Sequence, residues 1–379
     1  MRRLTTQAIF LCGALFACTA GPARDADSKA KPFKATPVAT FDAPWAMSFL
    51  PGSGVPLTTS ALVSEKTGAL WLVNTATGVK RKVEGVPAAY VAGQGGLGDV
   101  VAHPAFAANR RIYLSYVEKG AGGSGAVLAY GTLDPGASPR LADFKVIWRQ
   151  SPKVEGNGHF AHRIAFGPDG LLYLTSGDRQ KFDPAQATDG NLGKVLRLTP
   201  EGQPALGNPW AVKGGVAAQL WSIGHRNLLG IAFDADGRLW DSEMGPKGGD
   251  EINLIAAGKN YGWPKASNGS HYDGRDIPDH AAGDGFEPPK VWWNPSISPG
   301  GLMIYQGAKW PQWKGDAFVP ALSGEALIRV DLDGTSAKKA DQWPMGARIR
   351  AAVEGPNGDI YLLEDGDGAK LLRLDPVKP

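Results

Sequence analysis

Cysteine is nearly absent from this sequence. Only two cysteines, Cys12 and Cys18, occur among 379 residues, and both lie near the N-terminus. The chain beyond residue 18 therefore has no disulfide and must be stabilised by a buried core. The apolar run from Ala8 to Ala17 is too short to span a bilayer as a stable anchor.

Long helical patterns and strong charge are also missing. No long stretch repeats its apolar residues with the 3.6-residue period of an amphipathic helix. The formal net charge is only +3, and no group of Lys and Arg residues alternates with aromatic residues, so nucleic-acid binding is not indicated. In contrast, 51 glycines and 29 prolines are unusually many for a chain of 379 residues. This composition predicts many short strands joined by turns.

Residues 1–18 have the pattern of an export signal. Arg2 and Arg3 precede the apolar run, and small residues follow it. The four residues that end at Cys18 resemble a bacterial lipobox, in which Cys18 would carry a lipid and provide the only membrane attachment; plain secretion with Cys18 removed is the alternative. Residues 19–35 are small, polar and charged, which is typical of a flexible tether. We therefore expect an exported, periplasmic protein, which in the lipid-anchored case is an outer-membrane lipoprotein.

Three segments share one hairpin pattern: a strand, a turn with Asp or Asn before Gly, and a second strand with an aromatic or apolar centre. They are AFGPDGLLYLTSGD (165–178), AFDADGRLWDSEMG (232–245) and VEGPNGDIYLLEDGD (353–367), and weaker copies occupy 48–73 and 102–118. Hairpins spread over this length favour a β-propeller, whose closed ring protects the strand edges. We predict an all-β fold in which residues 36–379 form a six-bladed β-propeller with four-stranded antiparallel blades. A β-sandwich is the alternative.

Four longer motifs point to a known family. They are GQGGLGDVVAHPAF (93–106), LGKVLRL (192–198), the stretch from WSIGHRN to NYGWP (221–264) and RIRAAVEGPNGDIYLLEDGDGAKLLRL (348–374). In this order they resemble the soluble quinoprotein glucose dehydrogenases and the related aldose sugar dehydrogenases; L-sorbosone dehydrogenases are similar too. That family consists of six-bladed propellers that use pyrroloquinoline quinone (PQQ) and calcium. The resemblance implies oxidation of an aldose sugar at its anomeric carbon to a lactone, with a quinone or a cytochrome as electron acceptor.

The resemblance assigns the catalytic base to His159. An imidazole with a pKa of about 6.5 can accept a proton at neutral pH. In the family, the histidine that opens a His-x-x-x-Arg phrase takes the proton of the anomeric hydroxyl, and this phrase runs here from His159 to Arg163. Asp178, nineteen positions after His159, matches the carboxylate that orients the base. His162 is expected to be a loop or rim residue that touches substrate.

Cofactor contacts are also implied by the resemblance. PQQ is a flat tricarboxylate with an electrophilic quinone carbonyl, so its site needs cations and directed donors. Arg226 and Asn227 match cofactor residues of the family, with Arg226 placed to stabilise negative charge at the quinone. Arg348 and Arg350 alternate on one predicted strand, so they share a face, and they match a clamp on the cofactor carboxylates. Gln94 matches a cofactor-contacting amide.

The stretch EMGPKGGDEINLI is the predicted metal region. Calcium prefers oxygen ligands, including backbone carbonyls. In the family, the carbonyls of the Gly-Pro pair, here Gly245 and Pro246, hold the calcium that also binds PQQ. Glu251 and the backbone oxygen of Tyr261 match a second, structural calcium site. Asp250 is a neighbouring ligand or, equally, part of an acidic loop.

Two positions depart from the glucose dehydrogenases. Leu229 replaces a glutamine that contacts sugar or cofactor, and Ser323 lies near the position of a lysine on the cofactor. These departures favour the broader aldose-type branch over a glucose-specific enzyme. They also keep open a propeller that binds ligands without catalysis. A calcium-dependent propeller lactonase is a further alternative, which requires a ring of carboxylate and amide side chains in the central tunnel.

Two further expectations concern loops. Asp99 is expected to shape the loop that carries Gln94. The polar and aromatic segment 263–301 suits sugar stacking at a propeller mouth, although Trp292 or Trp293 alternatively packs between blades.

Overall fold

The computed structural model describes residues 30–52 and 59–377. The expected signal segment 1–18 with Cys18, and most of the expected tether, lie outside the described residues. Within the described ranges, no helix has the length and apolar character needed to cross a membrane.

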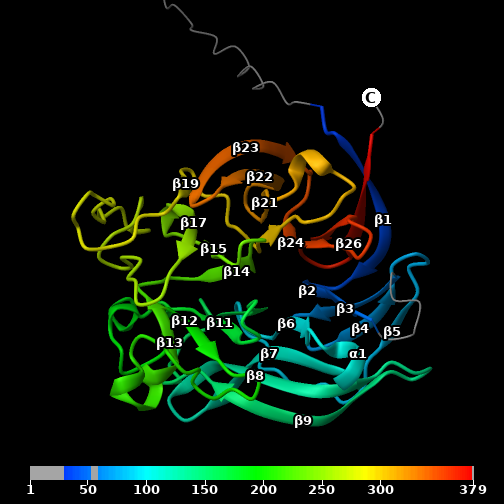
Figure 1. Ribbon diagram of the computed structural model, residues 1–379, viewed down its shortest axis with the longest axis horizontal. Helices are drawn as coiled ribbons and strands as arrows, with labels where there is room; N and C mark the ends of the chain where they lie inside the picture. The colour runs from blue at the N-terminus through cyan, green and yellow to red at the C-terminus, as the bar shows by residue number, and fades with distance from the viewer. Residues whose placement is uncertain (1–29, 53–58, 378–379) are drawn as a thin grey trace, which may run out of the picture. The chain divides into compact units, whose positions relative to one another are not determined.

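Six four-stranded antiparallel sheets are arranged around a central axis (Figure 1). This confirms the predicted six-bladed β-propeller and excludes the sandwich. Blade 1 contains β2 (Pro44–Phe49), β3 (Ser60–Glu65), β4 (Leu70–Asn74) and β5 (Lys80–Lys82). Blade 2 contains β6 (Leu97–Ala102), β7 (Arg111–Gly120), β8 (Gly123–Asp134) and β9 (Arg140–Arg149). Blade 3 contains β10 (Ala161–Phe166), β11 (Leu172–Ser176), β12 (Lys194–Leu198) and β13 (Leu220–Ile223).

The second half of the ring repeats this order. Blade 4 contains β14 (Leu228–Phe233), β15 (Leu239–Glu243), β17 (Asp250–Ile255) and β19 (Val291–Trp293). Blade 5 contains β20 (Met303–Ile304), β21 (Ala317–Ala321), β22 (Ala326–Asp333) and β23 (Ser336–Pro344). Blade 6 contains β24 (Ile349–Glu354), β25 (Ile360–Glu364), β26 (Ala369–Pro376) and β1 (Phe33–Phe41). The short elements are α1 (Phe106–Asn109), the paired β16 (Lys247–Gly248) and β18 (Gly269–Ser270), and the 3-10 turns η2 (Asp183–Gln186), η3 (Ala211–Lys213), η4 (Gly215–Gln219) and η5 (Pro311–Trp313).

The ring is closed by strands from its two ends. Strand β1 is the outermost strand of blade 6, where it pairs with β26 from Phe33 to Phe41. Thr36 also donates its hydroxyl to Asp375 at 3.0 Å. The propeller therefore begins at Phe33, inside the segment 19–35 expected to be a tether, because the strand supplies the missing edge of the last blade.

The three predicted hairpins form the two inner strands of blades 3, 4 and 6. They are β10–β11, β14–β15 and β24–β25. Gly170, Gly237 and Gly358 close their turns with φ of 75°, 80° and 72°, a conformation that glycine adopts without steric cost. The weaker copies supply strands of blades 1 and 2.

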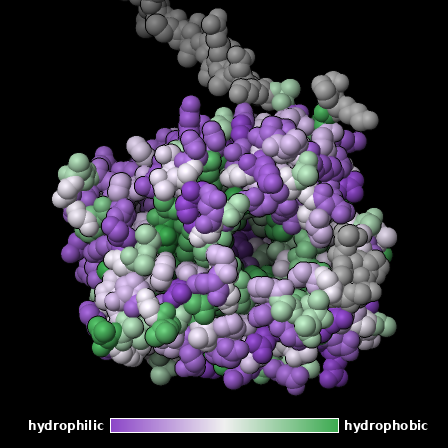
Figure 2. Space-filling model, viewed as in Figure 1, coloured by the Kyte–Doolittle hydropathy of each residue, from purple (hydrophilic) through white to green (hydrophobic). Residues whose placement is uncertain are grey.

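Apolar side chains fill the spaces between neighbouring blades. Figure 2 shows that the centre of the ring is hollow. One buried cluster joins blade 1 to blade 2, and it includes Leu62, Leu72, Leu114 and Val127. Another joins blades 5 and 6 and contains Trp310, Trp313 and Trp343. Each blade is thus held by its neighbours, so the loops at the ends of the hollow rest on a rigid ring.

The closing strand should contribute strongly to stability. Phe41 is 1% exposed, so Phe41→Ala should lower the free energy of unfolding by about 3–5 kcal/mol through lost burial and a residual cavity. Denaturant unfolding measures the change. Val79→Ala, at a side chain 60% exposed, is the matched control and should change it by less than about 0.5 kcal/mol. A loss below about 1 kcal/mol for Phe41→Ala would show that ring closure does not depend on this strand.

Candidate active site

The predicted site residues gather at one end of the ring. In each blade, the start of the first strand and the end of the second lie side by side, because the two strands are antiparallel. Most of the predicted residues lie within three positions of such a strand end. Those at these positions include Gln94, His159, Asp178, Arg226, Asn227, Gly245 and Arg348, and two residues that the sequence did not predict, Lys66 and Asp365, occupy equivalent positions.

His159 and Asp178 are in contact. His159 Nδ1 lies 2.7 Å from Asp178 Oδ1, and the Asp178 side chain is fully buried. The second carboxylate oxygen of Asp178 accepts a hydrogen bond from the indole of Trp263 at 2.8 Å. The backbone amide of Asp178 donates to the carbonyl of Arg226 at 2.8 Å. Asp178 is therefore fixed from three directions and can hold the imidazole in one orientation.

The backbone at the start of β10 turns His159 toward Asp178. His159 and Ala161 have positive φ of 49° and 57°, and the pairing of β10 with β11 shifts register after Ala161. Bulges of this kind re-aim side chains beside active sites. The His159 amide donates to the side-chain oxygen of Gln94 at 2.7 Å. The candidate base and the candidate cofactor amide are thus connected directly.

His159 is neutral at neutral pH. Burial, the largest cause, lowers its pKa below 6.5; the hydrogen bond to Asp178 opposes this shift, and the charges of Arg226 and Arg179 add to it. With Asp178 accepting from Nδ1, Nε2 is the nitrogen that can take a proton. His159 lines a pocket of about 250 Å³ together with Asp178, Arg226, Trp263 and Tyr272, which we call the His159 pocket.

A second pocket, of about 350 Å³, lies beside the first and shares Tyr272 with it. We call it the cationic pocket. Lys66, Arg348 and Arg350 line it, together with uncharged side chains that include Gln94, Asn227 and Leu229, and no carboxylate of the described residues does. Such a lining suits a polyanion.

Arg226 and Asn227 carry polar atoms without partners. Arg226 Nε and Asn227 Oδ1 are buried, and nothing in the described part of the chain hydrogen-bonds to them. Arg226 Nη1 donates to the carbonyls of Met244 at 2.9 Å and Gly245 at 2.6 Å, and Nη2 donates to the Tyr272 hydroxyl at 3.3 Å. Buried polar atoms normally have a partner. A polar ligand in these pockets is the group that the donor set fits.

Arg348 and Arg350 face the cationic pocket together, as their alternation on one strand predicts. Both donate to Asp365, Arg348 at 2.9 Å and Arg350 at 2.9 and 2.7 Å. Asp365 directly follows β25 within the sequence EDGDG. The carboxylate holds both guanidinium groups at the pocket wall, and the two arginines lower the pKa of Asp365 against the opposing effect of burial.

The predicted metal ligands also come together. Gly245, Pro246, Glu251 and Tyr261 all line one small pocket. Burial and the nearby Glu243 raise the pKa of the Glu251 carboxyl. A cation would relieve this repulsion, so the donor set fits an ion that prefers oxygen ligands.

Asp250 has a different arrangement. One oxygen accepts from the amide of Gly245 at 2.9 Å, and the other from the amides of Ile297 and Ser298 at 2.7 and 2.6 Å. Both oxygens are therefore used by the backbone. This favours the loop role over the ligand role, because Asp250 ties the Gly245 turn to the loop that ends at the cationic pocket.

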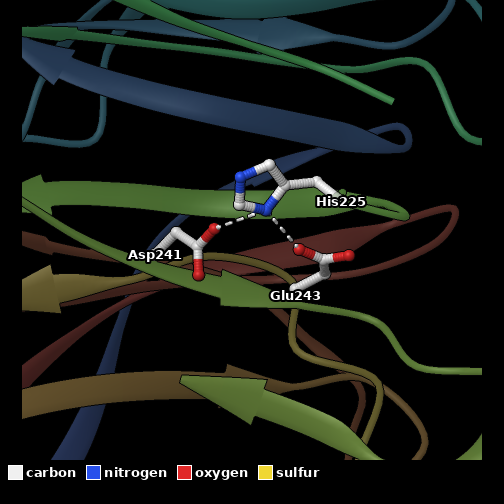
Figure 3. Close-up of side chains that lie close together, drawn as sticks. All are labelled: His225, Asp241 and Glu243. Atoms are coloured by element: carbon white, nitrogen blue, oxygen red, sulfur yellow. Dashed lines mark hydrogen bonds and ion pairs between the residues drawn. The ribbon is translucent and has the colours of Figure 1, made fainter. Parts of the chain in front are cut away.

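His225, Asp241 and Glu243 form a buried cluster (Figure 3). His225 Nδ1 lies 3.1 Å from Glu243 and 3.8 Å from Asp241, and Nε2 lies 2.8 Å from the Ser222 hydroxyl. Their ligand atoms lie within 4.8 Å of one another, close enough to hold a metal ion. Glu243 also accepts from the Arg226 amide, so the cluster fixes the backbone that presents Arg226.

His162 is not the rim residue that the sequence suggested. It is 2% exposed, its ring stacks on Trp45 with centroids 5.0 Å apart, and its Nδ1 lies 2.7 Å from the Ser115 hydroxyl. Burial lowers its pKa to about 3. The bulge in β10 turns this side chain inward, where it forms part of the cationic pocket wall.

Arg163 and Asp99 meet inside the ring. Arg163 lies 3.4 Å from Asp99, and it donates to the carbonyls of Leu229 at 2.7 Å and Gly300 at 2.6 Å. Asp99 also accepts from the Ile164 amide at 2.8 Å. Asp99 thus joins blade 2 to blade 3. The sequence predicted only that it shapes the loop that carries Gln94.

Comparisons with known proteins agree with this site. A family model described as Glucose / Sorbosone dehydrogenase matches residues 41–373. The chain belongs to this family. Aldose sugar dehydrogenase YliI of Escherichia coli (strain K12) is 37% identical over 342 residues, which cover 88% of this chain and 90% of that one.

Solved structures of sugar dehydrogenases superimpose on this family member. The apo form of the soluble aldose sugar dehydrogenase of Escherichia coli has a TM-score of 0.85 at 36% identity, covering 91% of this chain and 100% of that one. The PQQ-bound form of aldose sugar dehydrogenase from Streptomyces coelicolor has a TM-score of 0.75 at 29% identity, covering 90% and 97%. The family expected from the motifs is confirmed, and with it a PQQ-type sugar oxidoreductase.

The two departures from the glucose dehydrogenases lie at the cationic pocket. Leu229 lines it directly. Ser323 donates its hydroxyl to Ser298 at 2.8 Å, and Ser298 and Leu322 line the pocket beside it. This dehydrogenase therefore has no cation at position 323.

The segment 263–301 contributes to the His159 pocket through Trp263 and Tyr272. Trp293 is buried in the core of blades 4 and 5, whereas Trp292 is 48% exposed. Trp293 therefore packs between blades, which was the alternative predicted for one of these two tryptophans.

Sequence reasoning missed several residues at the cationic pocket of this dehydrogenase. Among them, Trp45 and Lys66 line the pocket, and Asp365 pairs with its two arginines. Lys66 directly follows β3 and Asp365 directly follows β25. Their position after the second strand of a hairpin is the signal that could have found them, because Asp178 and Gly245 occupy equivalent positions.

The buried His162 should make this dehydrogenase less stable in acid. Its folded pKa of about 3 lies below the unfolded value of about 6.5, so the unfolded state binds more protons as the pH falls below 6.5. The stabilisation is present above pH 6.5 and is lost on acidification toward pH 3. His162→Asn should therefore destabilise by about 1–3 kcal/mol at pH 7.5 and by progressively less toward pH 4. Denaturant unfolding at several pH values measures this; a difference that is constant or grows in acid would contradict it.

Proposed function

We propose that this protein is an exported, PQQ- and calcium-dependent dehydrogenase that oxidises an aldose at its anomeric carbon to the lactone. The observation that carries the proposal is the contact between His159 and Asp178, whose side chains lie 2.7 Å apart. This pair lies beside the cationic pocket, which three cationic side chains line and no carboxylate of the described residues lines. A base next to a polyanion pocket is the arrangement that hydroxyl oxidation with a tricarboxylate cofactor requires.

His159 would remove the proton of the anomeric hydroxyl at Nε2. Asp178 accepts from Nδ1, so it keeps the imidazole in the tautomer that exposes a lone pair at Nε2. It would also stabilise the imidazolium that forms. Trp263 and the Arg226 carbonyl hold Asp178 in place, so little reorganisation accompanies proton transfer.

The residues of the cationic pocket fit PQQ. Arg348, Arg350, Gln94 and Asn227 would hold its carboxylates and polar edge. When bound, PQQ supplies the carbonyl carbon that accepts the hydride of the sugar. Arg226 lines the neighbouring His159 pocket, where its guanidinium would stabilise negative charge that develops during the reaction.

Calcium fits the donors next to Arg226. The carbonyls of Gly245 and Pro246 would hold the ion that assists the cofactor, and Glu251 with the Tyr261 carbonyl a structural ion. The Gly245 carbonyl already accepts from Arg226, but a carbonyl oxygen has a second lone pair for a cation.

Residues 1–18 would direct export, with Cys18 as the lipid attachment of a periplasmic or outer-membrane form, and a quinone or cytochrome would accept the electrons.

The lactonase alternative finds no support. The cavity in the central channel is lined by one described carboxylate, Asp99, and Asp99 is paired with Arg163.

Replacing the base should slow turnover strongly while leaving the fold intact. After reconstitution with PQQ and calcium, sugar-dependent dye reduction by His159→Ala should be slower by about 10²–10⁴ in kcat. His103→Ala is the matched control, because His103 follows β6 at the opposite end of the ring, and it should keep wild-type activity. Dye reduction by His159→Ala within about tenfold of the wild-type kcat would contradict the role of this residue.

The pH profile should report the same base. Activity requires neutral His159, so kcat/KM is retained above the pKa of His159 and falls as the pH decreases through it. Because burial places this pKa below 6.5, the acid limb should have its midpoint below pH 6.5. Asp178→Asn removes the partner that raises the pKa, so the limb should move to lower pH and kcat should fall. An acid midpoint above pH 6.5 in the wild type would contradict this account.

A further inference from the structure

Lys66 lies at the cationic pocket but was not among the predicted cofactor residues. It directly follows β3, and its side chain lines the pocket with Arg348 and Arg350. Its ammonium group donates to the carbonyl of Gly93, next to Gln94. A neutral carbonyl holds the ammonium in place without cancelling its charge.

The charges around this pocket do not balance within the protein. Asp365 is the counter-ion of both Arg348 and Arg350. Burial lowers the pKa of Lys66, repulsion from Arg350 lowers it further, and Asp365 opposes these effects. Three cations therefore share one carboxylate at a partly buried surface, which costs free energy until an anion enters.

We propose that Lys66 is a cofactor-binding residue that pairs with a carboxylate of PQQ. This inference rests on the proposed function and adds a specific cation to it. PQQ carries three carboxylates, and the pocket offers three cations. Ser323, near the position where glucose dehydrogenases carry a lysine, is uncharged, and Lys66 supplies a positive charge to the same pocket from blade 1.

Lys66 has one competing role, as a tether. Its bond to the Gly93 carbonyl connects the β3–β4 turn to the loop that carries Gln94, and the Lys66 carbonyl accepts from the Leu97 amide at 3.1 Å. The backbone contact survives any substitution of the side chain. The side-chain contact is lost in Lys66→Met, so the test must separate charge from tethering.

Calorimetric titration with PQQ in the presence of calcium, at low and at moderate ionic strength, makes this separation. Lys66→Met should bind PQQ about 10- to 100-fold more weakly than the wild type, as expected for loss of a charge-assisted contact. Its affinity should also depend less on salt, because one screened ion pair is gone. Lys66→Arg keeps the charge and should restore most of the affinity. Lys82→Met removes an exposed lysine from the same blade and should bind like the wild type.

The outcomes are distinct. Wild-type affinity and salt dependence in Lys66→Met would overturn the inference. So would equal weakening in Lys66→Met and Lys66→Arg, or a lower melting temperature with unchanged affinity, because these results indicate a tether. Failure of the wild type to bind PQQ would overturn the proposed function as well, whereas normal wild-type binding with unaffected Lys66→Met overturns this inference alone.

Discussion

A single buried guanidinium joins most of the ring. Arg163 belongs to blade 3. Its guanidinium carbon lies 3.8 Å from the ring centroid of Trp45 in blade 1, and its side chain pairs with Asp99 in blade 2. It also donates to the carbonyls of Leu229 in blade 4 and of Gly300, which precedes blade 5. Burial lowers its pKa to about 10, so it stays charged at neutral pH. A buried charge is tolerated only when its donors are satisfied, and here satisfying them fixes the inner strands relative to one another.

This constraint has a consequence for the site. Leu229 lines both the cationic pocket and the cavity in the central channel, and Arg163 lines that cavity. The residues around Arg163 thus form a floor beneath the cationic pocket. His162 stacks on Trp45, and both line the cationic pocket, so the pocket is built on side chains that cannot move without breaking contacts across blades. A cofactor site on such a base is pre-organised.

The sequence was most informative where structure is local. Turn chemistry identified the hairpins whose turns contain Gly170, Gly237 and Gly358. The resemblance located His159 and Asp178 at the two ends of the first of these hairpins. What could not be predicted depends on contacts between blades. The inward turn of His162 follows from a bulge, and the roles of Asp365 and Lys66 depend on arginines far away in sequence or on a shared pocket wall. No local pattern reports such contacts.

The site divides its chemistry between two connected pockets. Burial keeps His159 neutral for proton transfer, while the unmatched cations next to it favour an anionic cofactor, and Gln94 connects the two.

The central claim is that the cationic pocket holds PQQ, and an absorption titration of the wild-type protein with PQQ in the presence of calcium tests it most directly. The account predicts a saturable spectral change that ends at one cofactor per chain. No spectral change at stoichiometric PQQ would contradict it.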